Sequence, residues 1–168
     1  NKLSRSGVFN EIGTYVIDSG TMWLQAIMNK VIAGEVKKKD SKRKKGDIVP
    51  EIQDYNRQQL RSLNILKSVL AIPCHVIVTG HADVYLEESD GKVHGSLLAP
   101  KGLQSKLPTL FDEFYMTRTS KTIKGIEYEV LVNNDGKYEA RTRLGRWQFE
   151  SVEECNLKNL IERGMKHG

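Results

Sequence analysis

Cysteine, proline and aromatic residues are scarce in this chain of 168 residues, and long hydrophobic runs are absent. Two cysteines, Cys74 and Cys155, are too few for a disulfide scaffold or a four-cysteine zinc site. No apolar run approaches the ~20 residues that a helix needs to cross a bilayer, so the sequence predicts no membrane-spanning helix. An apolar fraction of 39% with 28% charged residues is typical of a globular protein and not of a disordered one.

Positive charge is concentrated in one short segment. Seven of the nine residues between positions 37 and 45 are basic, and without them the chain is close to neutral. Such a run favours a polyanionic partner, either nucleic acid or a membrane surface, but a solvated insertion has the same composition. The seven residues are Lys37, Lys38, Lys39, Lys42, Arg43, Lys44 and Lys45.

Hydrophobic periodicity in the first half predicts alternating strands and helices. Residues 14–17 and 76–79 are short apolar runs that fit buried strands of a parallel sheet. After the first run, apolar residues recur at helical spacing as far as Gly34, which predicts a first helix. A second helix is expected from about residue 54 to residue 70. The apolar face of the second helix is expected to comprise Leu60, Leu63, Leu66, Val69 and Leu70.

The second half favours hairpins. Asp-Gly turns predict one hairpin over residues 84–98 and another over residues 127–142, and residues 113–117 form a third candidate core strand. Ser151 and Glu154 have the spacing of a capping box that begins a last helix. We therefore expect an α/β fold with a mainly parallel sheet and antiparallel hairpins at one edge.

Asp18 and His81 each follow a predicted buried strand. Ligands of parallel α/β sheets bind outside the carboxyl ends of the strands, so both residues are candidates for one site. The Asp18 carboxylate at a strand end can hold Mg²⁺, or it can cap the helix that begins near Thr21. His81 can donate a hydrogen bond to a terminal phosphate, or it can be satisfied by a neighbouring group.

Arg141 and Arg143 alternate on a predicted strand and would point to the same face. Two cations there can stabilise phosphate charge in a neighbouring subunit, as arginine fingers do. Charge also protects an exposed edge strand from pairing, and this interpretation stays open beside the first.

In their order along the chain, these features resemble the RecA-like P-loop ATPases, and most closely the phage-encoded AAA nucleotide-binding proteins of single-strand annealing and recombination. The carrying segments are TYVIDSGTMWL (14–24), DYNRQQLRSLNILKSVL (54–70), HVIVTGHAD (75–83), LPTLFDEFYMTR (107–118) and YEARTRLG (138–145). The resemblance covers nearly the whole chain. It implies one RecA-like ATPase core domain over residues 1–168, with three layers and a mainly parallel central sheet.

The resemblance also implies roles for single residues. Asp18 resembles the Walker B aspartate that ligates Mg²⁺, and Asp18 with Ser19 resembles the Asp-Ser pair of RecA-like proteins. His81 matches the strand-end position that couples the γ-phosphate to the DNA-binding loops. Arg141 and Arg143 resemble the pair that reaches into the ATP site of the next subunit.

The function implied by the resemblance is ATP binding and hydrolysis with Mg²⁺ by a homo-oligomer, a ring or a filament, on single-stranded DNA. Residues 37–46 take the place of the first DNA-binding loop, whose charge suits phosphate contacts. A cytoplasmic location, in the bacterial host of a phage, and no membrane partner are expected.

One departure from the family pattern is large. No G-x-x-x-x-G-K-[ST] motif occurs, and in this family the phosphate loop and the catalytic glutamate precede the strand expected at 14–17. Because the chain also starts with Asn1, we expect it to be part of a longer protein. Two alternatives remain open: a non-catalytic RecA-like module that binds nucleic acid or a phage protein through residues 37–45, and a packaging or helicase motor.

Overall fold

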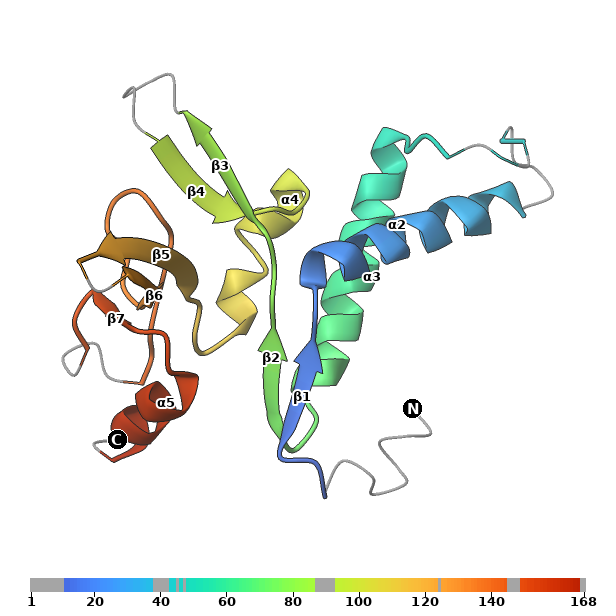
Figure 1. The fold of residues 1–168 in the computed structure, drawn as a ribbon. Coiled ribbons are helices and arrows are strands. Elements are labelled where there is room, and N and C mark those ends of the chain that lie inside the picture. The colour runs from blue at the N-terminus through green and yellow to red at the C-terminus, as the bar shows by residue number, and fades with distance from the viewer. Residues whose placement is uncertain are drawn as a thin grey trace. The chain divides into compact units, whose positions relative to one another are not determined.

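The computed structural model describes residues 11–37, 43–44, 46, 48–86, 93–123, 125–144 and 149–166 (Figure 1). The chain divides into two compact units. The first unit runs as far as His81 and also includes Leu97–Gln104. The second unit comprises Ala82–Ser96 and the chain from Ser105 onward.

The first unit is built on one parallel strand pair. Strand β1 (Thr14–Ile17) pairs with β2 (His75–Val78), with Thr14 opposite His75 and Ile17 opposite Val78. Parallel strands need a long crossover, which helices α2 (Gly20–Val36) and α3 (Ile52–Leu70) provide between them. The short helix α4 (Lys101–Gln104) completes the unit. The positions of the two strands and two long helices predicted for residues 14–79 are therefore confirmed, with shifts of only a few residues at their ends. Their predicted burial is wrong, because no residue of β1 or β2 is buried and Val16 is 54% exposed.

Helices α2 and α3 pack against each other and form the core of this unit. Helix α2 contributes an apolar stripe that comprises Leu24, Ile27, Met28, Val31 and Ile32. The buried stripe of α3 is mostly polar and comprises Asp54, Gln58, Ser62 and Leu66. Gln58 donates a 2.8 Å hydrogen bond to the Leu24 carbonyl. The predicted apolar face was therefore wrong at Leu60, which is 65% exposed, because α3 turns its 54-58-62-66 stripe toward α2.

The second unit is mostly antiparallel. Strands β3 (Ala82–Leu86) and β4 (Val93–Leu97) form a two-stranded sheet at the predicted first hairpin. Strands β5 (Met116–Thr122), β6 (Gly125–Leu131) and β7 (Val152–Glu154) form a three-stranded sheet. A 3₁₀ turn, η2 (Pro108–Leu110), precedes this sheet and helix α5 (Leu157–Met165) follows it. The apolar cluster of the second unit comprises Val130, Val132, Phe149 and Leu160.

The prediction of a RecA-like three-layer core with a mainly parallel central sheet is wrong for the described residues. They form three small separate sheets of two, two and three strands. Strands β1 and β2 pair in parallel, whereas β6 pairs antiparallel with both β5 and β7. The strand expected at 113–117 begins instead at Met116, and as β5 it pairs antiparallel with β6. Its sequence MTRTSKT is polar and mostly exposed, so this strand cannot fill the buried centre of a sheet.

The carboxyl-terminal part also differs from the prediction. Residues 152–154 form β7, and α5 is capped by Asn156, whose side chain accepts a 3.2 Å hydrogen bond from the Asn159 amide. The capping box expected at Ser151 was therefore wrong, because a better cap lies five residues later. Among the described helices, none combines the length and the apolar character needed to cross a bilayer.

Candidate functional site

The carboxyl ends of β1 and β2 place Asp18 and Thr79 side by side in the first unit. Because Ile17 lies opposite Val78, the next residue of each strand emerges at the same edge. The Thr79 hydroxyl donates a 2.5 Å hydrogen bond to Oδ1 of Asp18, and both residues are exposed. The carboxylate is thereby fixed at the edge where parallel sheets bind ligands.

The start of α2 is joined to this edge through glycine. The Gly20 amide donates a 2.6 Å hydrogen bond to the Thr79 carbonyl. A Cβ atom at Gly20 would lie 2.8 Å from Cγ1 of Val78, so the helix can approach the strand this closely only without a side chain.

The N-cap of α2 is Ser19, not Asp18. The Ser19 hydroxyl accepts a 3.3 Å hydrogen bond from the Met22 amide. The capping role that the sequence allowed for Asp18 is thus filled by its neighbour. The Asp18 carboxylate instead accepts the hydrogen bond from Thr79 at the carboxyl end of the strand pair.

His81 is held beside the same helix start by its backbone. Its amide donates a 3.1 Å hydrogen bond to the Thr21 hydroxyl, and its carbonyl accepts a 2.8 Å bond from the Leu98 amide. His81 itself is exposed. The structure therefore brings Asp18, Ser19 and His81 to one end of the parallel strand pair, as the sequence predicted.

The oxygen donors at this edge suit Mg²⁺. Asp18, Ser19 and Thr79 offer a carboxylate and two hydroxyls, and Mg²⁺ typically takes one or two protein carboxylates together with substrate phosphates and water. The described residues contain no cluster of three or more histidine, cysteine or acidic side chains, so this part of the chain offers no all-protein metal cage. The donor set therefore fits a magnesium ion that arrives with a nucleotide.

The first turn of α2 complements such a ligand. The helix has 17 residues and no acidic residue in its first turn. The positive end of its dipole attracts anions. A phosphate group placed there would lie next to the fixed Asp18 carboxylate.

Arg141 and Arg143 lie in the second unit and make different contacts. Nη2 of Arg141 donates to the carbonyls of Pro108 and Phe111, at 2.6 and 2.8 Å, and its backbone exchanges hydrogen bonds with Phe114. Arg143 pairs with Asp112 at 3.1 Å, and its side chain is 53% exposed. Arg141 thus holds a turn of its own chain, whereas Arg143 presents its cation at the surface.

Glu113 fixes the backbone around Arg143. Its Oε1 accepts hydrogen bonds from the amides of Arg143 and Leu144, at 2.8 and 3.0 Å. Its Oε2 accepts a 2.6 Å bond from the Tyr115 hydroxyl. Burial, and then the hydrogen bond to Glu113 and its charge, raise the pKa of Tyr115 well above its usual value.

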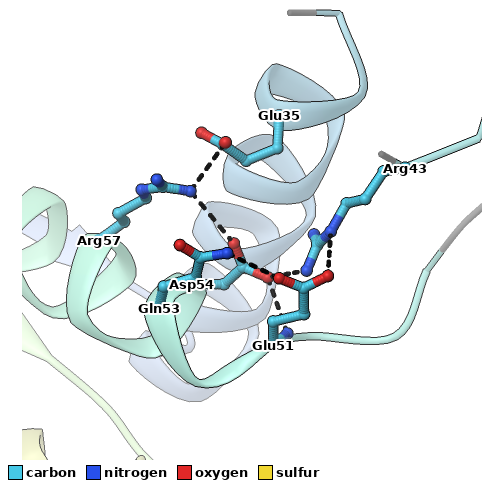
Figure 2. Close-up of polar contacts among 6 residues, drawn as sticks. All are labelled: Glu35, Arg43, Glu51, Gln53, Asp54 and Arg57. Atoms are coloured by element: carbon cyan, nitrogen blue, oxygen red, sulfur yellow. Dashed lines mark hydrogen bonds and ion pairs between the residues drawn. The ribbon is translucent and has the colours of Figure 1, made fainter. Parts of the chain in front are cut away.

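Of the seven basic residues at 37–45, the structure describes Lys37, Arg43 and Lys44, and Lys38, Lys39, Lys42 and Lys45 lie outside the described residues. Lys37 is the C-cap of α2. Arg43 turns toward the first turn of α3 (Figure 2). Its guanidinium contacts Asp54 at 2.5 Å and Glu51 at 3.1 Å, and its side chain is only 9% exposed.

Asp54 is the centre of this ion-pair network. It is completely buried, and its Oδ2 also accepts a 2.8 Å hydrogen bond from the Glu51 amide. Burial raises the pKa of Asp54, but the Glu51 amide and the Arg43 guanidinium outweigh this effect, so the pKa falls below its usual value. Arg57 extends the network to Glu35 of α2, at 2.8 Å. Arg43 therefore anchors the basic segment to α3.

Several residues of these sites were not predicted from the sequence. Thr79 ends the second predicted strand and Thr21 lies four residues after the first, so a hydroxyl near each predicted strand end was the available signal. Glu113 carried no such signal, because its partners come from residues 143 and 144.

Comparison with known proteins provides no further identification. No family model matches the chain, and neither curated proteins nor solved structures gave a match.

Proposed function

We propose that the chain binds a magnesium–nucleoside triphosphate, ATP in the first instance, at the carboxyl ends of β1 and β2. The observation that carries this proposal is the Asp18 carboxylate, fixed by Thr79 at the edge where α2 begins. A carboxylate at a strand end beside a helix N-terminus can share a metal ion with phosphates that the positive end of the helix dipole attracts.

Each residue has a distinct part in this proposal. Asp18 and Thr79 hold the metal, whose charge offsets that of the β- and γ-phosphates. The positive end of the α2 dipole attracts the phosphate oxygens, and His81 donates a hydrogen bond to the terminal phosphate. Hydrolysis also requires a group that activates water, and we assign that role to no described residue.

We further propose that the protein acts on single-stranded DNA through the basic segment, as an oligomer. The cations of residues 37–45 supply phosphate contacts, with Arg43 as their anchor on α3. Arg143 is the arginine suited to contact a neighbouring subunit, because Arg141 is engaged with Pro108 and Phe111.

Equilibrium binding of a fluorescent ATP analogue, with Mg²⁺ and with EDTA, tests the nucleotide site. Asp18→Asn should weaken magnesium-dependent binding by about tenfold or more, because a charge-assisted contact is lost. Asp83→Asn on β3 is the matched control and should bind as the native protein does. Equal affinities of the native protein and Asp18→Asn would refute the site.

A second candidate function is a non-catalytic nucleic-acid-binding module. It is favoured by the absence of a phosphate-loop motif from the sequence, together with the basic segment. In this case, replacing the lysines of residues 37–45 by glutamine abolishes DNA binding, and ATP leaves DNA affinity unchanged. Affinity should fall steeply with salt in both cases, and a flat salt dependence would contradict both.

A further inference from the structure

A groove in the first unit lies between the first two turns of α3 and helix α4. Its cavity volume is about 340 Å³, which lies within the range of small-ligand pockets. Helix α3 contributes Tyr55, Asn56 and Gln59, and Pro100, Lys101 and Gly102 are the main residues on the other side. The described residues that line this groove include no acidic side chain.

Both walls of the groove are fixed by contacts outside it. The first turn of α3 is held by the buried Asp54, which pairs with Arg43 (Figure 2). Helix α4 is anchored by Leu103, which is completely buried, and by a 3.2 Å hydrogen bond from Gln104 to the Leu97 carbonyl. The groove therefore needs little rearrangement before a ligand enters, which lowers the cost of binding.

Glycine sets the separation of the walls. A Cβ atom at Gly102 would lie 2.6 Å from Oε1 of Gln59. The amide end of Gln59 thus lies directly against the backbone of α4, and a larger residue at position 102 would displace it.

The chemistry of the lining suits a nucleobase. Tyr55 is 46% exposed, so its ring is open to a stacking partner. Asn56 and Gln59 carry amides that both donate and accept hydrogen bonds, as the edges of unpaired bases require. Lys101 adds a cation for a phosphate.

We propose that this groove binds one base of a single-stranded nucleic acid, stacked on Tyr55. Charge favours this occupant, because Lys101 lines the groove and no described lining residue is acidic. The basic Lys44 also follows Arg43, which pairs with the residue directly before Tyr55 on α3. A phosphate bound by Lys101 would flank a base in the groove. The inference rests on the nucleic-acid part of the proposed function and is independent of the nucleotide site at Asp18.

Two oligonucleotides of equal length, oligo(dT) and a fully abasic strand, separate stacking from phosphate contacts in a fluorescence-anisotropy titration. Tyr55→Ala should weaken oligo(dT) binding about 5- to 100-fold, the range of one stacked base, and leave abasic binding unchanged. Tyr55→Trp keeps a stacking surface and should retain affinity. Tyr128→Ala, at an exposed tyrosine of β6, is the matched control and should have no effect.

The salt dependence gives a second, independent result. Tyr55→Ala should leave the slope of log affinity against log salt unchanged, whereas Lys101→Ala should reduce it by about 0.7. Equal losses on both oligonucleotides, or no loss in Tyr55→Ala, would overturn the stacking site alone. If the native protein binds neither oligonucleotide, the nucleic-acid part of the proposed function fails together with the groove.

Discussion

Replacement of Arg43 by methionine tests whether the ion-pair network stabilises the first unit. The change removes the hydrogen bonds to Asp54 and Glu51 and leaves the Asp54 carboxylate completely buried. Removing one partner of a buried ion pair typically costs about 3–5 kcal/mol. Two groups soften the loss here: the Glu51 amide still donates to Asp54, and Arg57 lies 3.7 Å from its Oδ1.

We therefore expect Arg43→Met to lower the free energy of unfolding by about 2–3 kcal/mol. Urea unfolding followed by circular dichroism at 222 nm measures this, because α2 and α3 hold most of the described helical residues. With an m value of about 2 kcal/mol/M, the midpoint should fall by roughly 1–1.5 M. Arg61→Met, at an exposed position of α3, is the control and should leave the midpoint almost unchanged.

A double-mutant cycle decides whether the loss comes from the pair itself. Asp54→Asn keeps an acceptor for the Glu51 amide but removes the buried charge, so Arg43→Met should cost much less in that background. The expected coupling is about 1–2 kcal/mol. Additive effects of the two changes would refute the reasoning, because they would show that Arg43 stabilises the fold independently of Asp54.

Three further predictions follow from the same contacts. The pKa of Asp54 is lower in the folded state than in the unfolded state, so its ion pair stabilises the protein at pH values above the unfolded pKa. This contribution disappears as the pH falls through the folded pKa of Asp54. The difference in unfolding free energy between the native protein and Arg43→Met should therefore become smaller as the pH is lowered into the acid range. Gly20→Ala should lower the free energy of unfolding by about 1–3 kcal/mol, because its Cβ atom would collide with Val78. Gly34 has open space around it, so Gly34→Ala should leave the free energy of unfolding unchanged or raise it by up to about 1 kcal/mol. Thermal unfolding measures both. Arg141→Met should lower thermal stability, whereas exposed Arg143→Met should not; the reverse order would contradict the contacts of Arg141.

Local pattern was sufficient for the first half of the fold and insufficient for the second. The apolar runs at residues 14–17 and 76–79 were located correctly as strands, although neither strand is buried, and the helices between them are long and strongly periodic. In the second half, the Asp-Gly signal at Gly136 predicted pairing of 127–132 with 137–142, but β6 pairs with β5 and β7 instead. Which strands pair depends on competition between strands that are distant in the sequence, and the spacing of residues along the chain does not show which pairing is the more stable.

The same distinction governs the site residues. Asp18 and His81 could be found because their position depends only on where two strands end, and parallel pairing then brings those ends together. The roles of the arginines depend on what surrounds each guanidinium. Arg43 belongs to a basic run by sequence, yet the buried Asp54, eleven residues later, makes it an anchor. Residue type and spacing therefore located the charge, but only burial shows which cations remain available to a polyanion.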